Sequence, residues 1–342
     1  MLRDTLRKAA SGESLTEGEA ERALETIMEG NVPPAATAAL LTALRVKGEA
    51  VPEIVGFARA MRRFAGKVDA PDSVVDTCGT GGDAKGTINV STAAAFVARG
   101  AGVVVAKHGN RAATSRAGSA DVLEALGAEI ELGPAAVSRC IDESGIGFMF
   151  ARTHHPAMRF VAPVRAELPF RTIFNLLGPL TNPAGARRQL VGVFGGAYVR
   201  PVAEALRDLG AQKALVVHGT DGMDEITVTG TTIVADVSEE EGIEEYEISP
   251  EDFGLSRHDP DGLLGGDAHL NARILRDVLT GEEGGAARDV VLINAGATIY
   301  VSGHAETIGE GVDLARKSIS EGSAVGALDH FVRTTRRLSG TA

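Results

Sequence analysis

The first stretch whose residue types could do chemistry is rich in glycine and follows an apolar pair, Val74 and Val75. Four glycines fall between Gly79 and Gly86, and small polar side chains follow at Thr87, Asn89, Ser91 and Thr92. Glycine-rich loops after a strand offer backbone N–H groups to phosphate, and a helix start behind them adds the positive end of its dipole. The segment therefore predicts a phosphate-binding loop, with Ser91 capping the next helix.

This loop fits neither common nucleotide fingerprint well. Gly79, Gly81 and Ala84 satisfy the dinucleotide spacing, but residues 85–89 are poor helix formers, and the next predicted strand ends in Lys107 instead of an acidic residue. The P-loop pattern also fails, because it needs a lysine directly after its last glycine. A tight strand-to-helix turn without a ligand stays open as an alternative.

Two further loops follow predicted strands. Residues 107–121 carry three cationic side chains, Lys107, Arg111 and Arg116, among small residues, which predicts a loop that closes over an anion. Residues 219–225 hold three carboxylates, and the adjacent pair Asp224 and Glu225 suits a hard cation such as Mg²⁺. Taken alone, each could be a solvated surface loop, but the ligands of open parallel sheets bind beyond the carboxyl ends of the strands.

Four other residues were candidates for chemistry. His154 and His155 lack a third metal ligand nearby, so a cleft or structural role is favoured over a metal site. Cys78 lacks an activating histidine pattern and is better explained as a small buried residue. Arg165 could bind a carboxylate through both nitrogens, and a surface salt bridge is the alternative.

Composition narrows the function classes. The 342 residues carry a formal charge of −12, which argues against nonspecific binding to nucleic acid or to anionic membranes. We find no apolar run of about 18 residues and no apolar centre in the first residues, so neither a membrane span nor a signal peptide is expected. The only cysteines are Cys78 and Cys140, which predicts a reducing, cytoplasmic setting.

The elements that must position these loops fall into two kinds. Residues 2–64 read as four helices, near 2–10, 20–28, 35–46 and 51–64, with no strand between them. After about Val68, short apolar runs alternate with helical patterns. The C-terminal third is mostly helical, with helices expected near 261–279, 308–321 and 326–336. We therefore predict an α/β fold: a small all-helical domain plus a larger domain whose mainly parallel sheet is flanked by helices. The acidic stretch 238–247 is expected to be a solvated edge rather than a site.

Nearly the whole chain resembles the anthranilate phosphoribosyltransferases. The motifs that carry the resemblance are residues 76–83 (DTCGTGGD), 89–92 (NVST), 107–111 (KHGNR), 118–121 (GSAD), 154–158 (HHPAM), Arg165, 174–183 (FNLLGPLTNP), Asp224 and Glu225. The resemblance implies a helical domain of residues 1–69 with about 165–184, which serves dimerisation and the acceptor. It implies an α/β domain of residues 70–164 with 185–342, which binds the phosphoribosyl compound and metal, in a homodimer.

The resemblance also implies the reaction: anthranilate attacks C1 of phosphoribosyl pyrophosphate, and pyrophosphate leaves with the help of Mg²⁺, two ions in each active site. Contacts to phosphoribosyl pyrophosphate are expected from Gly79, Gly82, Asp83, Thr87, Asn89, Val90, Ser91, Thr92, Lys107, His108, Gly109, Asn110, Arg111, Ala112, Ala113, Thr114, Ser115 and Ser119. Contacts to anthranilate are expected from Gly79, Asn110, Arg165, His108, His154 and Gly178, and metal ligands from Ser91, Asp224 and Glu225.

The chemistry of the residues agrees with this reaction. Charge builds on the departing pyrophosphate, so Mg²⁺, Lys107 and backbone N–H groups are what its transition state requires. We predict no protein nucleophile and assign no general base, because the weakly basic aniline nitrogen needs mainly positioning.

Three other functions are alternatives to this reaction. A pyrimidine-nucleoside phosphorylase shares the expected fold, but the glycine-rich loop together with Asp224 and Glu225 favours a pyrophosphate–metal substrate. A phosphoribosyltransferase for another aromatic amine would not need Asn110 with Arg165, a carboxylate-directed pair. A non-catalytic nucleotide-binding regulator would not be expected to keep every site residue.

Overall fold

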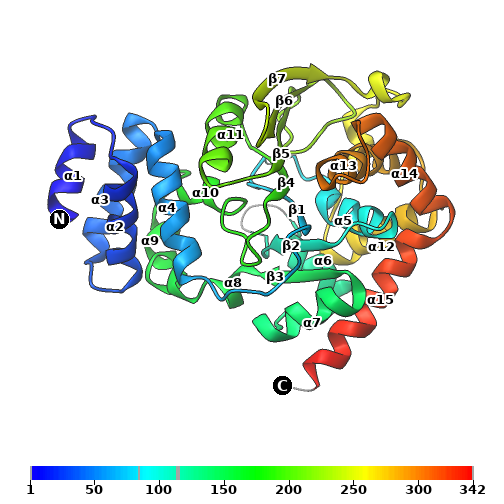
Figure 1. The fold of residues 1–342 in the computed structure, drawn as a ribbon, viewed down its shortest axis with the longest axis horizontal. Coiled ribbons are helices and arrows are strands. Elements are labelled where there is room, and N and C mark those ends of the chain that lie inside the picture. Colours follow the sequence, from blue (N-terminus) through cyan, green and yellow to red (C-terminus); the bar gives the residue numbers. More distant parts are fainter. Residues whose placement is uncertain (1, 84, 113–115, 341–342) are drawn as a thin grey trace.

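The protein has a helical end and a sheet-containing body, seen in a computed structural model that describes residues 2–83, 85–112 and 116–340. Ala84 of the glycine-rich loop, and Ala113, Thr114 and Ser115 of the predicted phosphoribosyl pyrophosphate contacts, lie outside the described residues. The N-terminal helices are α1 Leu2–Ala10, α2 Glu17–Met28, α3 Pro34–Lys47 and α4 Val51–Phe64, and they gather at one end of the molecule (Figure 1). This confirms the four predicted helices.

Local sequence sets where these helices begin and end. The Thr16 hydroxyl accepts from the Glu19 N–H, and the Glu19 carboxylate accepts from the Thr16 N–H at 2.8 Å, which satisfies two exposed N–H groups at the start of α2. Pro34 opens α3, where its missing N–H costs nothing, and Gly48 ends that helix with a φ of 88°.

The body is built on one seven-stranded sheet in the order β3-β2-β1-β4-β5-β6-β7. Its strands are β1 Val75–Gly79, β2 Val105–Gly109, β3 Ile146–Phe150, β4 Arg188–Gly192, β5 Lys213–Gly219, β6 Thr232–Ser238 and β7 Gly242–Ile248. The first five run parallel, whereas β6 and β7 are antiparallel. The predicted mainly parallel sheet is confirmed, and the acidic stretch 238–247 forms the outer turn and edge strand.

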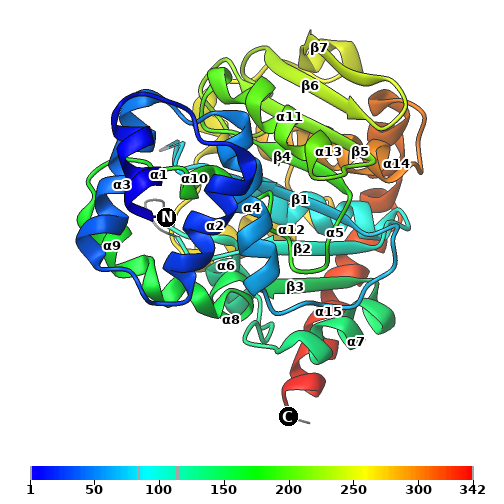
Figure 2. The ribbon, with the colours of Figure 1, turned by 60° about the vertical axis from the view of Figure 1, so that its left-hand side comes forward.

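Helices cover both faces of the sheet (Figure 2). The longer ones are α5 Val90–Gly100, α6 Ser119–Ala125, α7 Pro134–Ser144, α11 Val199–Asp208, α12 Ala268–Thr280, α13 Gly285–Ser302, α14 Ile308–Ser320 and α15 Ser323–Ser339. Short 3-10 turns lie at η1 Pro156–Phe160, η2 Gly196–Tyr198, η3 Pro250–Phe253 and η4 Pro260–Leu263. In the described part of the chain, none of the helices combines the length and apolar character needed to cross a membrane.

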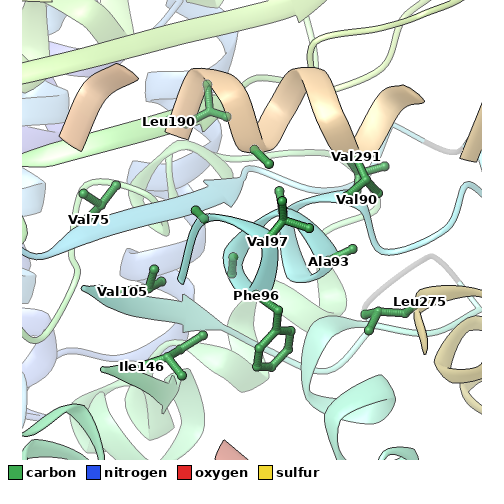
Figure 3. Close-up of a cluster of buried hydrophobic side chains, with 14 of the residues drawn as sticks. Val75, Val90, Ala93, Phe96, Val97, Val105, Ile146, Leu190, Leu275 and Val291 are labelled. Atoms are coloured by element: carbon green, nitrogen blue, oxygen red, sulfur yellow. The ribbon is translucent and has the colours of Figure 1, made fainter. Parts of the chain in front are cut away.

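The main core lies between the sheet and α5 (Figure 3). Phe96 and Val97 of α5 pack against strand side chains such as Val105 and Ile146. Helix α13 lies next to α5 and also contacts β1, β4 and β5, and α12 packs against α5. Burying this apolar surface is the main stabilising contribution to the fold, roughly 25 cal/mol for each Å² removed from water.

The chain returns to the helical end after β3. This returning segment, residues 151–183, contains α8 Ala151–His154, α9 Ala162–Glu167 and α10 Phe174–Leu177, and its Phe174 ring packs edge-on against Phe57 of α4 at 6.1 Å. Where the connections cross, the Gly66 N–H donates to the His154 carbonyl at 2.8 Å and the Val68 N–H to the Pro183 carbonyl at 3.1 Å. The helical end is therefore joined to the body by three backbone crossings that are bonded to one another.

Candidate active site

The glycine-rich loop, residues 79–89, leaves β1 and is fixed to the neighbouring strands. The Thr80 N–H donates to the Gly192 carbonyl at 2.9 Å, and the Gly81 N–H donates to the Asp224 carboxylate at 2.6 Å. Gly81 and Gly82 have φ values of 68° and 75°, a left-handed backbone that favours glycine. The loop therefore needs its glycines for backbone shape, and no helix begins until Val90, as predicted.

The start of α5 is bound by a carboxylate, and the prediction that Ser91 caps it is wrong. Asn89 is the capping residue by position, yet its side chain donates to the Ala117 carbonyl and accepts from Asn271 instead. The Ser91 N–H donates to Glu225 at 3.2 Å. An exposed N–H at this helix start is thus satisfied by an acidic side chain from another loop.

The acidic loop, residues 220–226, packs directly against two strand glycines. A Cβ on Gly79 would overlap the Asp224 carboxylate, and a Cβ on Gly192 would overlap the Asp224 main-chain oxygen. Asp224 and Glu225 are consequently held over the ends of β1 and β4, beside the glycine-rich loop. The prediction that these loops share one crevice is confirmed by this contact.

The acidic loop concentrates negative charge in a buried place. Burial raises the pKa of Asp224, and the nearby Asp83 carboxylate raises it further. Burial also raises the pKa of Glu225, and the charge of Asp224 adds to this effect. A divalent cation would relieve the repulsion among these carboxylates. Among the described residues, no three His, Cys, Asp or Glu side chains are grouped to hold a metal alone, so an ion here would need substrate oxygens as ligands.

Lys107 lies beneath the crevice rather than in an open loop. Its side chain is buried, and its ammonium donates to the Thr77 carbonyl at 2.6 Å and to the Ser91 hydroxyl at 3.2 Å. Burial lowers the pKa of Lys107, while the buried Asp76 carboxylate and Glu225 act in the opposite direction. The lysine thus orients the Ser91 hydroxyl and places positive charge under the phosphate loop.

His108 is a neutral, buried side chain at the junction of the two domains. Burial lowers the pKa of His108 to about 3, and its Nδ1 lies 3.1 Å from the Gly178 carbonyl of the returning segment. The rings of His108 and His155 are 5.0 Å apart. The Nε2 atoms of His108, His154 and His155 are buried and have no hydrogen-bond partner among the described residues. These imidazoles line the junction of the two domains, which supports a cleft role and not a metal site.

Arg111 is exposed and engaged by carboxylates. It forms ion pairs with Asp121 at 3.0 Å and with Glu124, and both partners raise the pKa of Arg111. The neighbouring Asn110 is exposed, and its carbonyl accepts from the Ser119 hydroxyl at 3.3 Å. Lys107 is therefore buried and Arg111 is paired, so these two cations do not lie free in one open loop.

Arg165, in α9, has the surroundings expected of a carboxylate-binding residue. Its guanidinium lies over the Phe174 ring at 5.4 Å, and burial lowers the pKa of Arg165. It forms no ion pair with any carboxylate of the described residues. A partly buried arginine without a protein counter-ion is suited to an anionic ligand.

Sequence reasoning assigned no role to four residues of this site, Asp76, Arg171, Asn182 and Gly192, although Asp76 and Asn182 lie in motifs that carry the resemblance. Asp76 accepts from the Asn182 amide at 2.7 Å and from the His108 N–H at 3.1 Å, which ties the returning segment to the sheet. Arg171 donates to the Gly82 carbonyl in the glycine-rich loop. A signal existed for Gly192, because a glycine inside a strand often marks a close approach of backbone.

Changing Gly192 to Ala is expected to destabilise the protein and to displace the acidic loop. The new methyl group would collide with the main-chain oxygen of Asp224, and relieving such overlap costs about 1–3 kcal/mol. We expect the melting temperature to fall by about 1–4 °C in calorimetry, since an unfolding entropy of about 2.1 cal/mol/K for each residue makes about 1 kcal/mol worth roughly 1.4 °C in a chain of 342 residues. Gly326→Ala, in open space within α15, is the control, and an equal melting temperature for both variants would contradict the packing argument.

A helical bundle paired with an α/β body, with polar loops gathered at the strand ends, is the architecture of a class of glycosyl transferases. Residues 3–65 match the helical bundle domain of a glycosyl transferase family, and residues 71–325 match its a/b domain. The chain is 79% identical over 340 residues to an anthranilate phosphoribosyltransferase of Rubrobacter xylanophilus, covering 99% of both chains.

Solved structures agree with this match. The crystal structure of anthranilate phosphoribosyltransferase from Thermus thermophilus is 48% identical, with a TM-score of 0.92, covering 97% of this chain and 99% of that one. The Saccharomyces cerevisiae enzyme in complex with PRPP and Mg is 29% identical, with a TM-score of 0.90 and 98% of each chain covered. The chain therefore belongs to the anthranilate phosphoribosyltransferase family. It is an enzyme that transfers a phosphoribosyl group to anthranilate in tryptophan biosynthesis.

Proposed function

We propose that the crevice binds phosphoribosyl pyrophosphate with Mg²⁺ on its sheet side and anthranilate on its helical side. The observation that carries this proposal is the contact between the glycine-rich loop and the acidic loop, in which the Gly81 N–H donates to Asp224. This contact puts a phosphate loop and two cation-seeking carboxylates at one place.

On the sheet side, the glycine-rich loop and the start of α5 hold the pyrophosphate through backbone N–H groups and hydroxyls. The proposed contacts are Gly79, Gly82, Asp83, Thr87, residues 89–92, residues 107–115 and Ser119. Lys107 acts through the Ser91 hydroxyl and through its charge, because its ammonium is already bonded to the Thr77 carbonyl.

Ser91, Asp224 and Glu225 are the proposed protein ligands of Mg²⁺, with two ions in each site. Raised pKa values of both carboxylates support this, because a nearby dication stabilises their charged forms. Asp83 lies close enough to raise the pKa of Asp224, which supports a place for Asp83 beside the metal or its bound waters; a contact to a ribose hydroxyl is the alternative.

On the helical side, Arg165 binds the anthranilate carboxylate, and Gly79, Asn110, His108, His154 and Gly178 line the acceptor path. The neutral state of His108 supports this role, since its Nδ1 is committed to the Gly178 carbonyl and its Nε2 is left as an acceptor. The Nε2 atom can accept a hydrogen bond from an N–H of the aromatic amine. This bond would orient the lone pair of the amine nitrogen toward C1.

The transfer then requires charge stabilisation and positioning. Mg²⁺, when bound, neutralises the charge that develops on pyrophosphate as the bond from C1 breaks. The backbone N–H groups of the glycine-rich loop hold the same oxygens, and Lys107 adds a buried positive charge behind them. Arg165 fixes the acceptor so that its nitrogen faces C1 without a protein nucleophile.

We also propose a homodimer in the cytoplasm, with the helical domain of residues 1–69 and 165–184 as the dimer side. Val46 on α3 is 82% exposed, an unusual position for a large apolar side chain that a subunit contact would cover. Both cysteines are free and buried, which suits a reducing compartment.

A single assay tests the proposed function. Enzyme, Mg²⁺, phosphoribosyl pyrophosphate and anthranilate are mixed, and the loss of anthranilate fluorescence is followed. We expect loss that needs both Mg²⁺ and phosphoribosyl pyrophosphate and that releases one pyrophosphate for each anthranilate consumed. Unchanged fluorescence together with phosphorolysis of thymidine would overturn the proposal in favour of a nucleoside phosphorylase.

A further inference from the structure

Arg171 connects the returning segment to the glycine-rich loop. It lies between Arg165 and α10, and its guanidinium donates to the Gly82 carbonyl. The same guanidinium lies over the Phe194 ring, with its central carbon 4.1 Å from the ring centroid. In the described part of the chain, Arg171 forms no ion pair with a carboxylate. Among the described residues, the Gly82 carbonyl is therefore the only polar partner of the Arg171 side chain.

The ring beneath Arg171 is fixed to that same loop. Phe194 follows β4, and its N–H donates to the Thr80 hydroxyl at 3.0 Å. Phe194 also packs on Tyr198 at 4.9 Å between ring centroids, and the Tyr198 hydroxyl accepts from Arg45 of α3 at 3.0 Å. A continuous set of contacts thus runs from the helical domain to the glycine-rich loop.

The loop is held from two sides at adjacent residues. The acidic loop holds the Gly81 N–H through Asp224, and the returning segment holds the Gly82 carbonyl through Arg171. These two groups belong to the peptide before Gly81 and the peptide after Gly82, so the two bonds together fix the backbone through both glycines. The bond to the Gly82 carbonyl orients the Gly82–Asp83 peptide, and with it the Asp83 N–H on the opposite side of that peptide. Gly82 has a φ of 75°, so its peptide has no side chain to restrict it and depends on these bonds.

We propose that Arg171 is a positioning residue for the phosphoribosyl pyrophosphate site. It holds the Gly82 carbonyl so that the glycine-rich loop presents its N–H groups to the pyrophosphate before the substrate arrives. Because Arg171 and Arg165 share the returning segment, the arginine also links the acceptor side of the crevice to the sheet side. This inference rests on the proposed function, in which that loop binds the pyrophosphate.

The test compares Arg171→Met, Arg171→Lys and Phe194→Leu with the matched control Arg159→Met. Arg159 also lies over an aromatic ring, that of Phe160, on the same segment, but both side chains are exposed. We expect Arg171→Met to raise the dissociation constant of Mg²⁺–phosphoribosyl pyrophosphate, measured by calorimetry without anthranilate, and its KM by about tenfold. The KM for anthranilate should change less than about threefold, and Arg171→Lys should recover only part, because a lysine lacks the planar fork.

Phe194→Leu should act in the same direction and through the same contact. The double variant Arg171→Met with Phe194→Leu should therefore be no worse than Arg171→Met alone. Additive effects, or equal losses for both substrates with a lowered melting temperature, would overturn the inference. If the wild-type protein itself fails to bind Mg²⁺–phosphoribosyl pyrophosphate, the proposed function fails. If the wild type binds it and all Arg171 variants bind it equally well, only the role of Arg171 fails.

Discussion

Replacing Asp224 by Asn and Glu225 by Gln together is expected to abolish most Mg²⁺-dependent transfer. Asp224 is buried and Glu225 is half-buried beside the glycine-rich loop, and the change keeps their shape while removing their charge. Metal stabilisation of a leaving phosphate is worth several kcal/mol, so we expect kcat/KM for phosphoribosyl pyrophosphate to fall by roughly 10³-fold. The Mg²⁺ concentration that gives half-maximal rate should rise steeply in a titration at fixed substrate.

The matched control changes two acids that lie far from the crevice. Glu240 and Glu241 are exposed in the turn between β6 and β7, so Glu240→Gln with Glu241→Gln alters the net charge equally. This control should keep the wild-type Mg²⁺ titration. The double variant at Asp224 and Glu225 should also keep its fold by circular dichroism, since removing two repelling charges does not weaken packing. A wild-type metal response in that double variant would remove the metal role of the acidic loop.

Arg165→Ala is expected to impair binding of anthranilate far more than binding of phosphoribosyl pyrophosphate. The guanidinium is partly buried over Phe174 and pairs with no carboxylate in the described part of the chain, so its removal deprives the acceptor carboxylate of its proposed partner. Hydrogen bonds to charged groups contribute about 1.5–3 kcal/mol, which corresponds to roughly 10- to 150-fold in KM for anthranilate. Steady-state kinetics with each substrate varied in turn measures this split.

Two further variants test the role of Arg165, one at the same position and one as a control. Arg165→Lys keeps the charge but not the planar fork, so its KM for anthranilate should lie between those of the wild type and Arg165→Ala. Arg152→Ala changes an exposed arginine on α8 and should have no effect. Similar increases in KM for both substrates in Arg165→Ala would place the arginine elsewhere in the reaction.

The sequence was most informative about positions and least informative about charge states. The loops after β1, β2 and β5 were predicted from residue types because parallel strands end at one edge. The sequence could not reveal that Lys107 is buried, that His108 is neutral or that Arg111 is engaged by two carboxylates, since each depends on residues far away in the chain. Arg171 was missed for the same reason, because its ring and its carbonyl partner come from other loops.

The helix α13 shows why one element escaped the pattern analysis. It is buried almost all round, so its apolar residues lack the one-sided spacing that marks a surface helix. Gly296 in this helix faces Gly311 of α14, where added Cβ atoms would overlap backbone. Such close packing uses small residues that carry little periodic signal.

The three bonded crossings between the domains affect the order in which the protein can fold during its synthesis. The family's helical bundle domain matches only residues 3–65, but the core around Phe57 also contains Val161, Phe174 and Leu180 from the returning segment. A nascent chain that has emerged only through α4 lacks these side chains, and their apolar partners stay in water. Domains usually complete their folding in order from the N-terminus during synthesis. Here the first domain to be synthesised can complete its core only after β1, β2 and β3 have been made, because its last core residues follow these strands in the chain.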